Sequence, residues 1–295
     1  MSDRNDPVDK RLVRKAFDKA VSTYDEAAVL QREVAERVLE RLDYLKIKPE
    51  VILDIGSGTG FCTSFLNNRY TDARVISLDV SEHMLGHARS LHAHDRNSFV
   101  CADAEQLPFA DKSVDFIFSN LTLQWCSDLA HTFSEFRRVL RTNGLVMFST
   151  FGPDTLGELR ASWQSVDDYE HVNRFVDLHI VGDALVAAGM GDVVMDNENI
   201  TVTYREVKTL MKDLKDIGAH NVTTGRQKTI TGKQHLKKMI EAYEEFRNDG
   251  VLPATYEVVY GHAWALENIK VKGPTEVRVP VQSLNLKMFT QDQDS

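Results

Sequence analysis

The chain has 295 residues, of which 42% are hydrophobic and 27% charged, a balance typical of a soluble globular protein with one large domain or one domain plus an insertion. Its net charge of −9 argues against a general nucleic-acid binder. No apolar run approaches the roughly 20 residues of a membrane helix, and the acidic N-terminus lacks the apolar segment of a signal or transit peptide. We therefore expect neither a membrane nor a nucleic acid as partner.

Cysteine and histidine patterns bear on metal and redox chemistry. The three cysteines, Cys62, Cys101 and Cys126, are scattered and lack C-x-x-C spacing, which argues against a disulfide framework and a zinc site. The ten histidines form no H-E-x-x-H motif. We therefore expect a cytoplasmic protein without a metal cofactor.

The first 48 residues are expected to form an N-terminal helical cap (1–48). Apolar side chains recur at helical spacing over 8–21 and again over 27–45, and a polar hinge at 22–25 separates the two segments. Pro49 marks the end of the cap. The sequence thus predicts two helices ahead of the first strand.

From residue 51 to residue 151, short buried runs alternate with helical segments, which is typical of a βαβ series with a parallel sheet. A ligand of such a sheet lies outside the carboxyl ends of its strands. The polar residues that follow each strand are therefore the candidates for binding. The predicted strands are 51–55, 75–80, 99–102, 116–119 and 145–151.

The remainder of the chain continues the alternation and adds an insertion. We expect helices at 154–165, 176–189, 206–217 and 233–247, and strands at 193–204, with an irregularity near Asn197–Asn199, and at 256–265. The chain divides into a core at 49–205, a basic helical insertion at 206–250, a last core strand at 251–267 and a tail at 268–295, where the composition favours partial disorder.

The first strand leads into a glycine-rich loop at residues 54–60. Glycines at alternate positions can adopt positive φ and leave room for a ligand, although a purely structural tight turn is the alternative. The third glycine comes one residue too early for the nucleotide motif G-x-G-x-x-G. The D-x-G-x-G-x-G pattern resembles the first motif of class I S-adenosylmethionine (SAM) methyltransferases. The candidate binding residues of the loop are Asp54, Gly56, Ser57, Gly58 and Gly60.

The second strand ends at Asp79, whose carboxylate can accept both hydroxyls of a ribose. The alternative is an N-cap on the next helix, a role that Ser81 can already fill. Val80 and Met84 can form an apolar wall beside an adenine, although ordinary core packing explains them nearly as well.

The third and fourth strands end in further candidate binding residues. Asp103 can accept the exocyclic amine of adenine while the neighbouring backbone, including Ala104, donates to a ring nitrogen; a solvated loop acid is the alternative. A backbone carbonyl at Asn120–Leu121 can hold the methionine ammonium. Together, the four strand ends over 50–151 resemble a class I SAM-dependent methyltransferase. The resemblance implies an α/β Rossmann-like fold with a mostly parallel seven-stranded sheet and helices on both faces.

Outside this core, five stretches resemble the malonyl-[acyl-carrier protein] O-methyltransferase (BioC) family of biotin synthesis. The resemblance covers roughly 8–265 and implies SAM-dependent methylation of the free carboxylate of malonyl-ACP, in early pimeloyl synthesis. Masking this charge lets fatty-acid enzymes treat the short chain as apolar, since a bare carboxylate is costly to desolvate. The stretches are 17–28, 119–126, 150–160, 213–221 and 252–264.

The insertion has a charge pattern that suits an acidic carrier protein. Residues 205–238 contain nine basic and three acidic residues, a net charge of +6 in a chain of −9. Lys208, Lys212 and Lys215 recur on one face of a helix whose other face is apolar. Acyl-carrier proteins are acidic, so complementary charge would steer docking. A solvated basic face without a partner is the alternative.

Substrate residues are predicted less directly. Arg160 and Arg226 can bind the malonyl carboxylate in a bidentate manner, although either can equally be a surface or ion-pair residue. Trp125 is assigned to the substrate side. Tyr24, in the hinge of the cap, can close over the methyl group or can simply pack there. No histidine or glutamate stands out as a base beside Asn120, which mildly favours a carboxylate acceptor.

Two other functions remain open from the sequence. One is methyl transfer to another small acid or to a quinone-type ring, against which the basic insertion argues weakly. The other is a SAM-binding assembly factor without methyl transfer.

Overall fold

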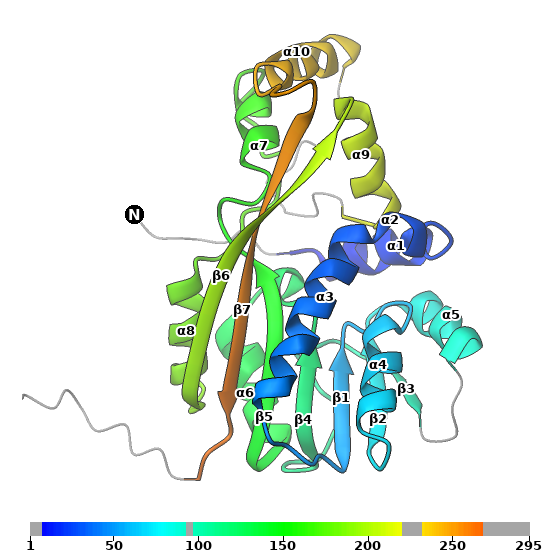
Figure 1. The fold of residues 1–295 in the computed structure, drawn as a ribbon, viewed down its shortest axis with the longest axis vertical. Coiled ribbons are helices and arrows are strands. Elements are labelled where there is room, and N and C mark those ends of the chain that lie inside the picture. The colour runs from blue at the N-terminus through cyan, green and yellow to red at the C-terminus, as the bar shows by residue number, and fades with distance from the viewer. Residues whose placement is uncertain (1–7, 93–96, 220–231, 268–295) are drawn as a thin grey trace, which may run out of the picture.

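The computed structural model describes residues 8–92, 97–219 and 232–267, and its centre is a seven-stranded sheet (Figure 1). The strand order is β3-β2-β1-β4-β5-β7-β6. Strands β1 to β5 run parallel, and β7 is antiparallel to both of its neighbours. The predicted mostly parallel α/β fold is confirmed. The strands are β1 Val51–Ile55, β2 Arg74–Asp79, β3 Ser98–Cys101, β4 Val114–Ser119, β5 Leu140–Phe151, β6 Gly191–Tyr204 and β7 Leu252–Trp264.

The helices fall close to the expected ranges, with two differences in the cap. A one-turn helix, α2, begins in the second half of the predicted hinge and ends at Ala27. The long helix after it ends at Arg41 and continues as a short 3₁₀ turn, η1 (Leu42–Tyr44). The helices are α1 Lys10–Ala20, α2 Tyr24–Ala27, α3 Val29–Arg41, α4 Phe61–Arg69, α5 Glu82–His92, α6 Leu129–Val139, α7 Gly157–Gln164, α8 Leu178–Ala187, α9 Val207–Asp216 and α10 Lys233–Glu244, with a second 3₁₀ turn, η2, at Leu123–Trp125.

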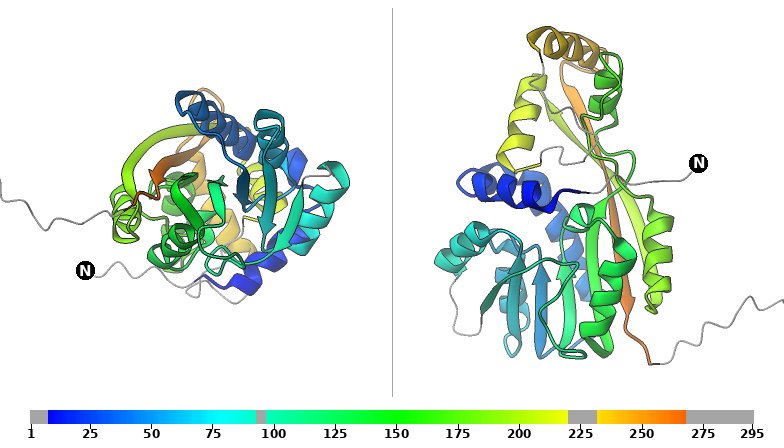
Figure 2. Two further views of the ribbon diagram at one scale, coloured as in Figure 1. Left: turned by 90° about the horizontal axis from the view of Figure 1, so that it is seen from below. Right: turned by 180° about the vertical axis from the view of Figure 1, so that it is seen from behind.

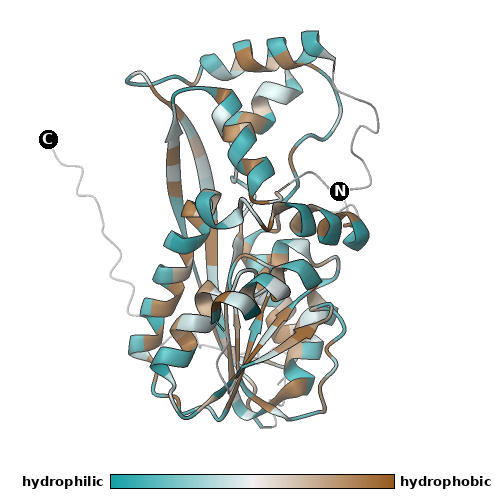
Figure 3. Ribbon diagram, turned by 90° about the vertical axis from the view of Figure 1, so that its right-hand side faces the viewer, coloured by the Kyte–Doolittle hydropathy of each residue, from teal (hydrophilic) through white to brown (hydrophobic). Residues whose placement is uncertain are grey.

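The two faces of the sheet are covered by different helices because neighbouring residues of a strand point to opposite sides. Ile52 of β1 packs in one apolar cluster with α3 and α4, and the next residue, Leu53, packs in a second cluster with α6 and α8. Figures 1 and 2 show these helices on the two sides of the sheet. In Figure 3, hydrophilic and hydrophobic bands alternate along the helices, as expected for elements that cover a core on one side.

Strands β6 and β7 extend beyond the sheet as a two-stranded arm. Strand β5 pairs with β7 only over Val258–Trp264, so residues 252–257 pair with β6 alone. Helices α7, α9 and α10 gather around this arm (Figure 1). The irregularity predicted near Asn197–Asn199 is wrong, because pairing there is continuous. The register shifts between Gly191 and Val194 instead, beside Asp192 with its φ of +47°.

The cap lies across the carboxyl ends of the strands, where α1 and α2 are seen above β1 and α4 (Figure 1). Thr59 Oγ1 of the glycine loop donates to Asp25 Oδ1 at 2.6 Å, and Ser81 Oγ donates to Asp18 Oδ1 at 2.6 Å. These bonds hold the cap over the region where a ligand is expected. None of the helices in the described residues is long and apolar enough to cross a membrane.

Candidate active site

Most of the predicted cofactor residues surround a single pocket at the carboxyl ends of β1, β2 and β4, which we call the strand-end pocket. Residues from the cap also line it, including Lys10 and Phe17, which the sequence analysis did not single out. The predicted residues that line it are Tyr24, Gly56, Gly58, Asp79, Val80, Met84, Asp103, Ala104, Asn120, Leu121 and Trp125.

The glycine loop has the tight geometry that its spacing predicts. Gly56 has a φ of +71°, and a Cβ placed there would lie 1.9 Å from Thr122 Oγ1. Gly60, at the N-cap of α4, has a φ of +91°, and a Cβ there would lie 2.7 Å from His92 Cδ2. Gly58 also has positive φ, but the nearest atom to its Cβ position is Tyr24 Cε1, at 3.9 Å. The backbone at Gly58 therefore borders open space.

Asp54 is not among the residues that line the strand-end pocket. Its carboxylate is 1% exposed, and Oδ2 accepts a hydrogen bond of 2.6 Å from Thr63 Oγ1, which lies 2.9 Å from Ser77 Oγ. Burial raises the pKa of Asp54 to about 7, although the Thr63 hydrogen bond opposes the shift. We therefore assign Asp54 to support of the loop. Ser57 lines an adjoining surface pocket.

Asp79 connects the glycine loop to α5. Its Oδ2 accepts from the Gly58 amide at 2.9 Å and its Oδ1 from the Ser81 amide at 2.8 Å. Ser81 caps the helix, because its hydroxyl accepts from the Met84 amide at 3.1 Å. Burial raises the pKa of Asp79 to about 6. The carboxylate thus lines the pocket with acceptor capacity to spare.

Asp103 has a partner that the sequence did not reveal. Lys10 of α1 donates from Nζ to Asp103 Oδ1 at 2.9 Å and also forms an ion pair with Glu105. The Glu105 amide donates to the same Asp103 oxygen at 3.0 Å. The acid expected at the adenine end is therefore tied to the cap.

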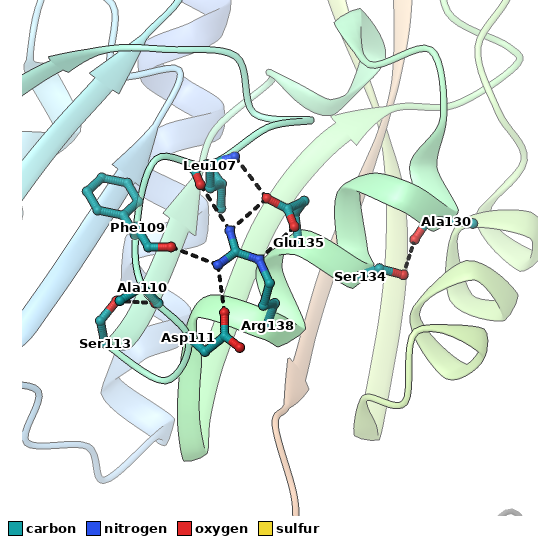
Figure 4. Close-up of polar contacts among 9 residues, drawn as sticks. All are labelled: Leu107, Phe109, Ala110, Asp111, Ser113, Ala130, Ser134, Glu135 and Arg138. Carbon is teal, nitrogen blue, oxygen red and sulfur yellow. Dashed lines mark hydrogen bonds and ion pairs between the residues drawn. The ribbon is translucent and has the colours of Figure 1, made fainter.

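The loop that follows Asp103 is held by Arg138 of α6 (Figure 4). Its guanidinium donates to the carbonyls of Leu107 and Phe109 at 2.9 and 2.7 Å, and to Asp111 Oδ1 at 2.9 Å. Glu135 completes the cluster, accepting from Arg138 Nε at 2.7 Å and from the Leu107 amide at 3.0 Å. The hydrogen bond from Arg138 lowers the pKa of Glu135. One side chain thereby fixes the course of the loop.

The end of β4 is held in a strained conformation. Leu121 has a φ of +48°, a region that a leucine rarely adopts, and its amide donates to Ser149 Oγ at 3.0 Å. Ser149 also donates to Asn120 Oδ1 at 2.7 Å, and Asn120 Nδ2 donates to the Gln31 carbonyl of the cap at 3.0 Å. The side chain of Asn120 therefore orients the backbone that borders the pocket.

A second pocket, which we call the insertion pocket, lies between the cap and the insertion. Leu214 and Ile217 of the α9 region line one side. The cap and α9 are joined by a hydrogen bond of 2.8 Å from Thr23 Oγ1 to the Asp216 carbonyl. The described residues that line this pocket include no Asp, Glu, Lys or Arg. Among the residues that the structure describes, four line both pockets and form what we call the junction: Phe17, Tyr24, Leu121 and Trp125.

The junction is largely aromatic. Phe17 and Trp125 meet edge to face with ring centroids 5.5 Å apart. Burial raises the pKa of Tyr24, with the charge of Asp79 adding to the effect. Tyr24 therefore keeps its phenolic proton at neutral pH and can donate a hydrogen bond into either pocket.

Arg160 does not line either of these pockets. It donates to the carbonyls of Pro153, Thr155 and Asn173 at 3.0, 3.1 and 3.4 Å, and burial lowers the pKa of Arg160. Both terminal nitrogens of Arg160 are thus bonded to the backbone, and its expected binding of a substrate carboxylate stays a prediction that this geometry does not favour. Arg226 lies outside the described residues.

The lysines expected to bind a partner are exposed on α9. Lys208, Lys212 and Lys215 face solvent while Val207 and Leu210 are buried. Lys212 forms an ion pair of 2.6 Å with Asp216. This basic face therefore lies on the helix whose C-terminal part borders the insertion pocket.

Several pocket residues were missed by the sequence analysis. Gln31 of α3 and His171 and Asn173, which follow α7, line the insertion pocket. They come from separate segments and form no motif, so no sequence signal links them.

Within the described ranges, the structure shows no cluster of three His, Cys, Asp or Glu side chains that could hold a metal ion.

Comparison with solved structures shows the fold. Residues 53–148 match the family model described as a methyltransferase domain. The chain is similar to the YcgJ protein from Bacillus subtilis (TM-score 0.55, 15% identity, 78% of this chain and 98% of that chain). It is also similar to phosphoethanolamine N-methyltransferase 2 from Haemonchus contortus (TM-score 0.54, 16% identity, 85% of this chain and 57% of that chain). The fold is therefore the Rossmann-like fold of class I methyltransferases.

Curated relatives match nearly the whole chain. A malonyl-[acyl-carrier protein] O-methyltransferase from Nitrosospira multiformis is 52% identical over 274 residues, which cover 87% of this chain and 89% of the relative. A relative of the same name from Halorhodospira halophila is 44% identical and covers 94% of this chain and 96% of its own length. The match extends well beyond the methyltransferase core. The chain therefore belongs to the malonyl-[acyl-carrier protein] O-methyltransferase family.

Proposed function

We propose that the protein transfers a methyl group from SAM to the free carboxylate of a malonyl group carried by an acyl-carrier protein. The observation that carries this proposal is the junction, where the strand-end pocket and the insertion pocket share Phe17, Tyr24, Leu121 and Trp125. A methyl donor in the strand-end pocket and a methyl acceptor in the insertion pocket would meet there. The names of the close relatives support the same reaction.

The residues of the strand-end pocket fit SAM. The backbone at Gly58 borders open space at the turn, and Asp79 retains acceptor capacity for the ribose hydroxyls. Asp103 and Ala104 would meet the adenine, and the backbone at Asn120 and Leu121 the methionine end. When bound, SAM supplies an activated sulfonium methyl group and a positive charge.

The insertion pocket suits a carboxylate that attacks without a base. A carboxylate is already the reactive form, so the protein must position it and exclude water. The described lining residues include no acid that would repel it. Phe17 and Trp125 restrict water at the junction, and Tyr24 can donate a hydrogen bond to one carboxylate oxygen while the other reacts.

The exposed face of α9 is the proposed docking surface of the carrier protein. Lys208, Lys212 and Lys215 present positive charge to an acidic partner, while Leu214 and Ile217, farther along the same segment, border the insertion pocket. Charge complementarity of this kind raises the association rate and orients the partner. An acyl group attached to a protein docked there is delivered close to the pocket.

Intact-protein mass spectrometry tests the proposal directly. Incubation with SAM should add the mass of one CH₂ group to malonyl-ACP and none to acetyl-ACP, which lacks the free carboxylate. Malonyl-CoA is included to measure the preference for the carrier protein. Equal methylation of acetyl-ACP, or no methylation of any malonyl thioester by a protein that binds SAM, would contradict it. The quinone-type acceptor and the non-catalytic assembly factor are not retained, because the chain belongs to a family of O-methyltransferases.

A further inference from the structure

Buried polar atoms without hydrogen-bond partners gather where the insertion pocket, lined by Asn173, adjoins a surface pocket lined by Arg160 and Asp167. Within the described residues, six buried side-chain nitrogen or oxygen atoms have no hydrogen-bond partner. Four of them lie in one group of neighbouring side chains: Arg160 Nε, Asp167 Oδ2, Asn173 Oδ1 and His235 Nδ1. Buried polar atoms are normally paired, so such a concentration indicates a place where a ligand or water completes the bonding.

His171 is fixed at the centre of this group. Its Nε2 lies 2.8 Å from Asp167 Oδ1, and its ring stacks on Trp163 with centroids 3.8 Å apart and an interplanar angle of 10°. Burial alone would raise the pKa of Asp167, but the hydrogen bond from His171 lowers it. The carboxylate can only accept, so Nε2–H of His171 is the donor, and Nδ1 is the ring nitrogen that remains for a ligand.

The polar end lies away from the junction. His171 and Asn173 line the insertion pocket but not the strand-end pocket. His171 also lines an outer pocket on the surface, together with Arg160 and Trp163. A chain that entered from the outer pocket with its reactive end at the junction would therefore pass His171 and Asn173.

This end also lies beside the insertion. His235 Nδ1, in the first turn of α10, is 3.9 Å from Asp167 Oδ2. Lys233, Lys237 and Lys238 are on the same helix. The exposed lysines of α10 therefore add positive charge beside this polar end, which is the side from which a chain tethered to an acidic carrier protein would arrive.

We infer that His171 and Asn173 bind the amide groups of the prosthetic arm that links the malonyl thioester to its carrier protein. This inference rests on the proposed function. Phosphopantetheine contains two secondary amides, and each amide N–H needs an acceptor when it leaves water. Asn173 Oδ1 is a buried acceptor without a partner in this largely apolar pocket, and the inference gives His171 Nδ1, in the same wall, the second acceptor role. The arm is thus recognised by its amides, separately from the carboxylate that reacts.

Substrates with and without the amides test the inference. His171→Phe keeps a ring against Trp163, and Asn173→Leu keeps the side-chain size. Each variant should lower kcat/KM for malonyl-ACP and for malonyl-pantetheine roughly tenfold, the effect of one lost hydrogen bond with its partner left unpaired. For malonyl ethyl thioester, which has no amide, kcat/KM should stay within about twofold of the wild type. The matched controls, His179→Phe and Asn199→Leu, change exposed residues elsewhere and should change none of the three rates.

An equal loss on all three substrates would overturn the inference, because it would indicate a base or a structural role for His171. Binding of pantetheine alone, followed by ligand-observed NMR, separates this inference from the proposed function. Pantetheine binding that both variants weaken would support the arm site even if the wild type methylated no malonyl thioester. Wild-type turnover of malonyl-pantetheine with unchanged values in both variants would overturn the arm site and leave the proposed function standing.

Discussion

Lys10 and Asp103 lie 93 residues apart in the chain, yet the lysine ammonium donates to the aspartate carboxylate at 2.9 Å. The bond joins α1 to the loop at the end of β3 and crosses the wall of the strand-end pocket. Both side chains are about one-third exposed, so solvent weakens the pair without removing it. The Lys10–Asp103 ion pair therefore holds the cap to the sheet at the wall of the strand-end pocket.

Loss of the Lys10–Asp103 ion pair should speed the dissociation of a ligand from the strand-end pocket. We expect Lys10→Ala to raise the dissociation rate of S-adenosylhomocysteine several-fold, up to roughly tenfold, since one charge-assisted bond contributes about 1 kcal/mol or slightly more. Stopped-flow fluorescence measures the rate. Lys15→Ala, an exposed lysine of the same helix, is the control. Identical dissociation rates for Lys10→Ala and Lys15→Ala would show that the Lys10–Asp103 ion pair does not retain the ligand.

Substitutions in the glycine loop should separate folding from binding. In Gly56→Ala the new Cβ would lie 1.9 Å from Thr122 Oγ1, and the alanine would have to adopt the positive φ of Gly56. We therefore expect the free energy of unfolding to fall by about 1–3 kcal/mol and SAM binding to be lost. Gly58→Ala has no atom closer than 3.9 Å and should be less destabilising while still weakening SAM binding. Thermal denaturation and calorimetric titration give the two quantities. Equal destabilisation by both substitutions would be the contrary result.

SAM affinity should depend on the ionisation of Asp79. Burial raises the pKa of this carboxylate from 3.8 to about 6, so ionisation costs folding stability as pH rises through that interval. Ribose binding needs the ionised form, which accepts two hydroxyls. Affinity should therefore be full above about pH 7 and fall as pH drops through about 6. Calorimetry of wild type and Asp79→Asn is the test, and the variant should be weak and nearly independent of pH.

Asp54 provides the control for this profile, because its pKa is raised to about 7 while it lies outside the pocket wall. Asp54→Asn should retain the fall near pH 6. If Asp54→Asn removed the fall in SAM affinity near pH 6 and Asp79→Asn did not, the assignment of that fall to Asp79 would be incorrect.

Removal of the Arg138 guanidinium should destabilise the protein. Arg138→Ala leaves the carbonyls of Leu107 and Phe109 without this donor and Glu135 without its ion-pair partner. We expect the free energy of unfolding to fall by about 1–3 kcal/mol, measured by urea denaturation. Arg11→Ala, at an exposed position of α1, should change stability by less than about 0.5 kcal/mol. Comparable values would show that the cluster contributes little.

Reversal of charge on α9 should affect the carrier substrate alone. The triple variant Lys208→Glu, Lys212→Glu and Lys215→Glu should lower kcat/KM for malonyl-ACP by at least tenfold and reduce its salt dependence. Malonyl-pantetheine and SAM affinity should be unaffected. Lys46→Glu with Lys48→Glu, both exposed before β1, is the matched control. A comparable loss in that control would indicate a nonspecific effect of net charge.

The parts of the fold that depend on local sequence were predictable. The strand, acid and glycines of 51–60 specify their own geometry through φ and the missing Cβ atoms, so the loop was identified from the sequence. The β6 register shift was misplaced, because it depends on Asp192 adopting positive φ against β7, a pairing that the chain makes only after folding.

The choice of partners for long charged side chains was not predictable. Arg160 was expected at a substrate, but a turn of α7 directs its fork to the carbonyls of Pro153 and Thr155. Likewise, no residue near Asp103 in the sequence indicates that Lys10 is its partner. His171 depends on Asp167 and Trp163 coming together beside α10, which periodicity and motifs do not encode.

The hydrogen bond from Thr23 to the Asp216 carbonyl joins the cap to α9. Tyr24, the next residue, lines both pockets, so a methyl donor that shifted Tyr24 would also alter the wall of the pocket proposed for the methyl acceptor. We therefore expect a compulsory-order mechanism in which SAM binds first and S-adenosylhomocysteine leaves last. An acyl chain that remained in place would then trap the spent donor as an abortive complex, which makes the enzyme sensitive to accumulated product.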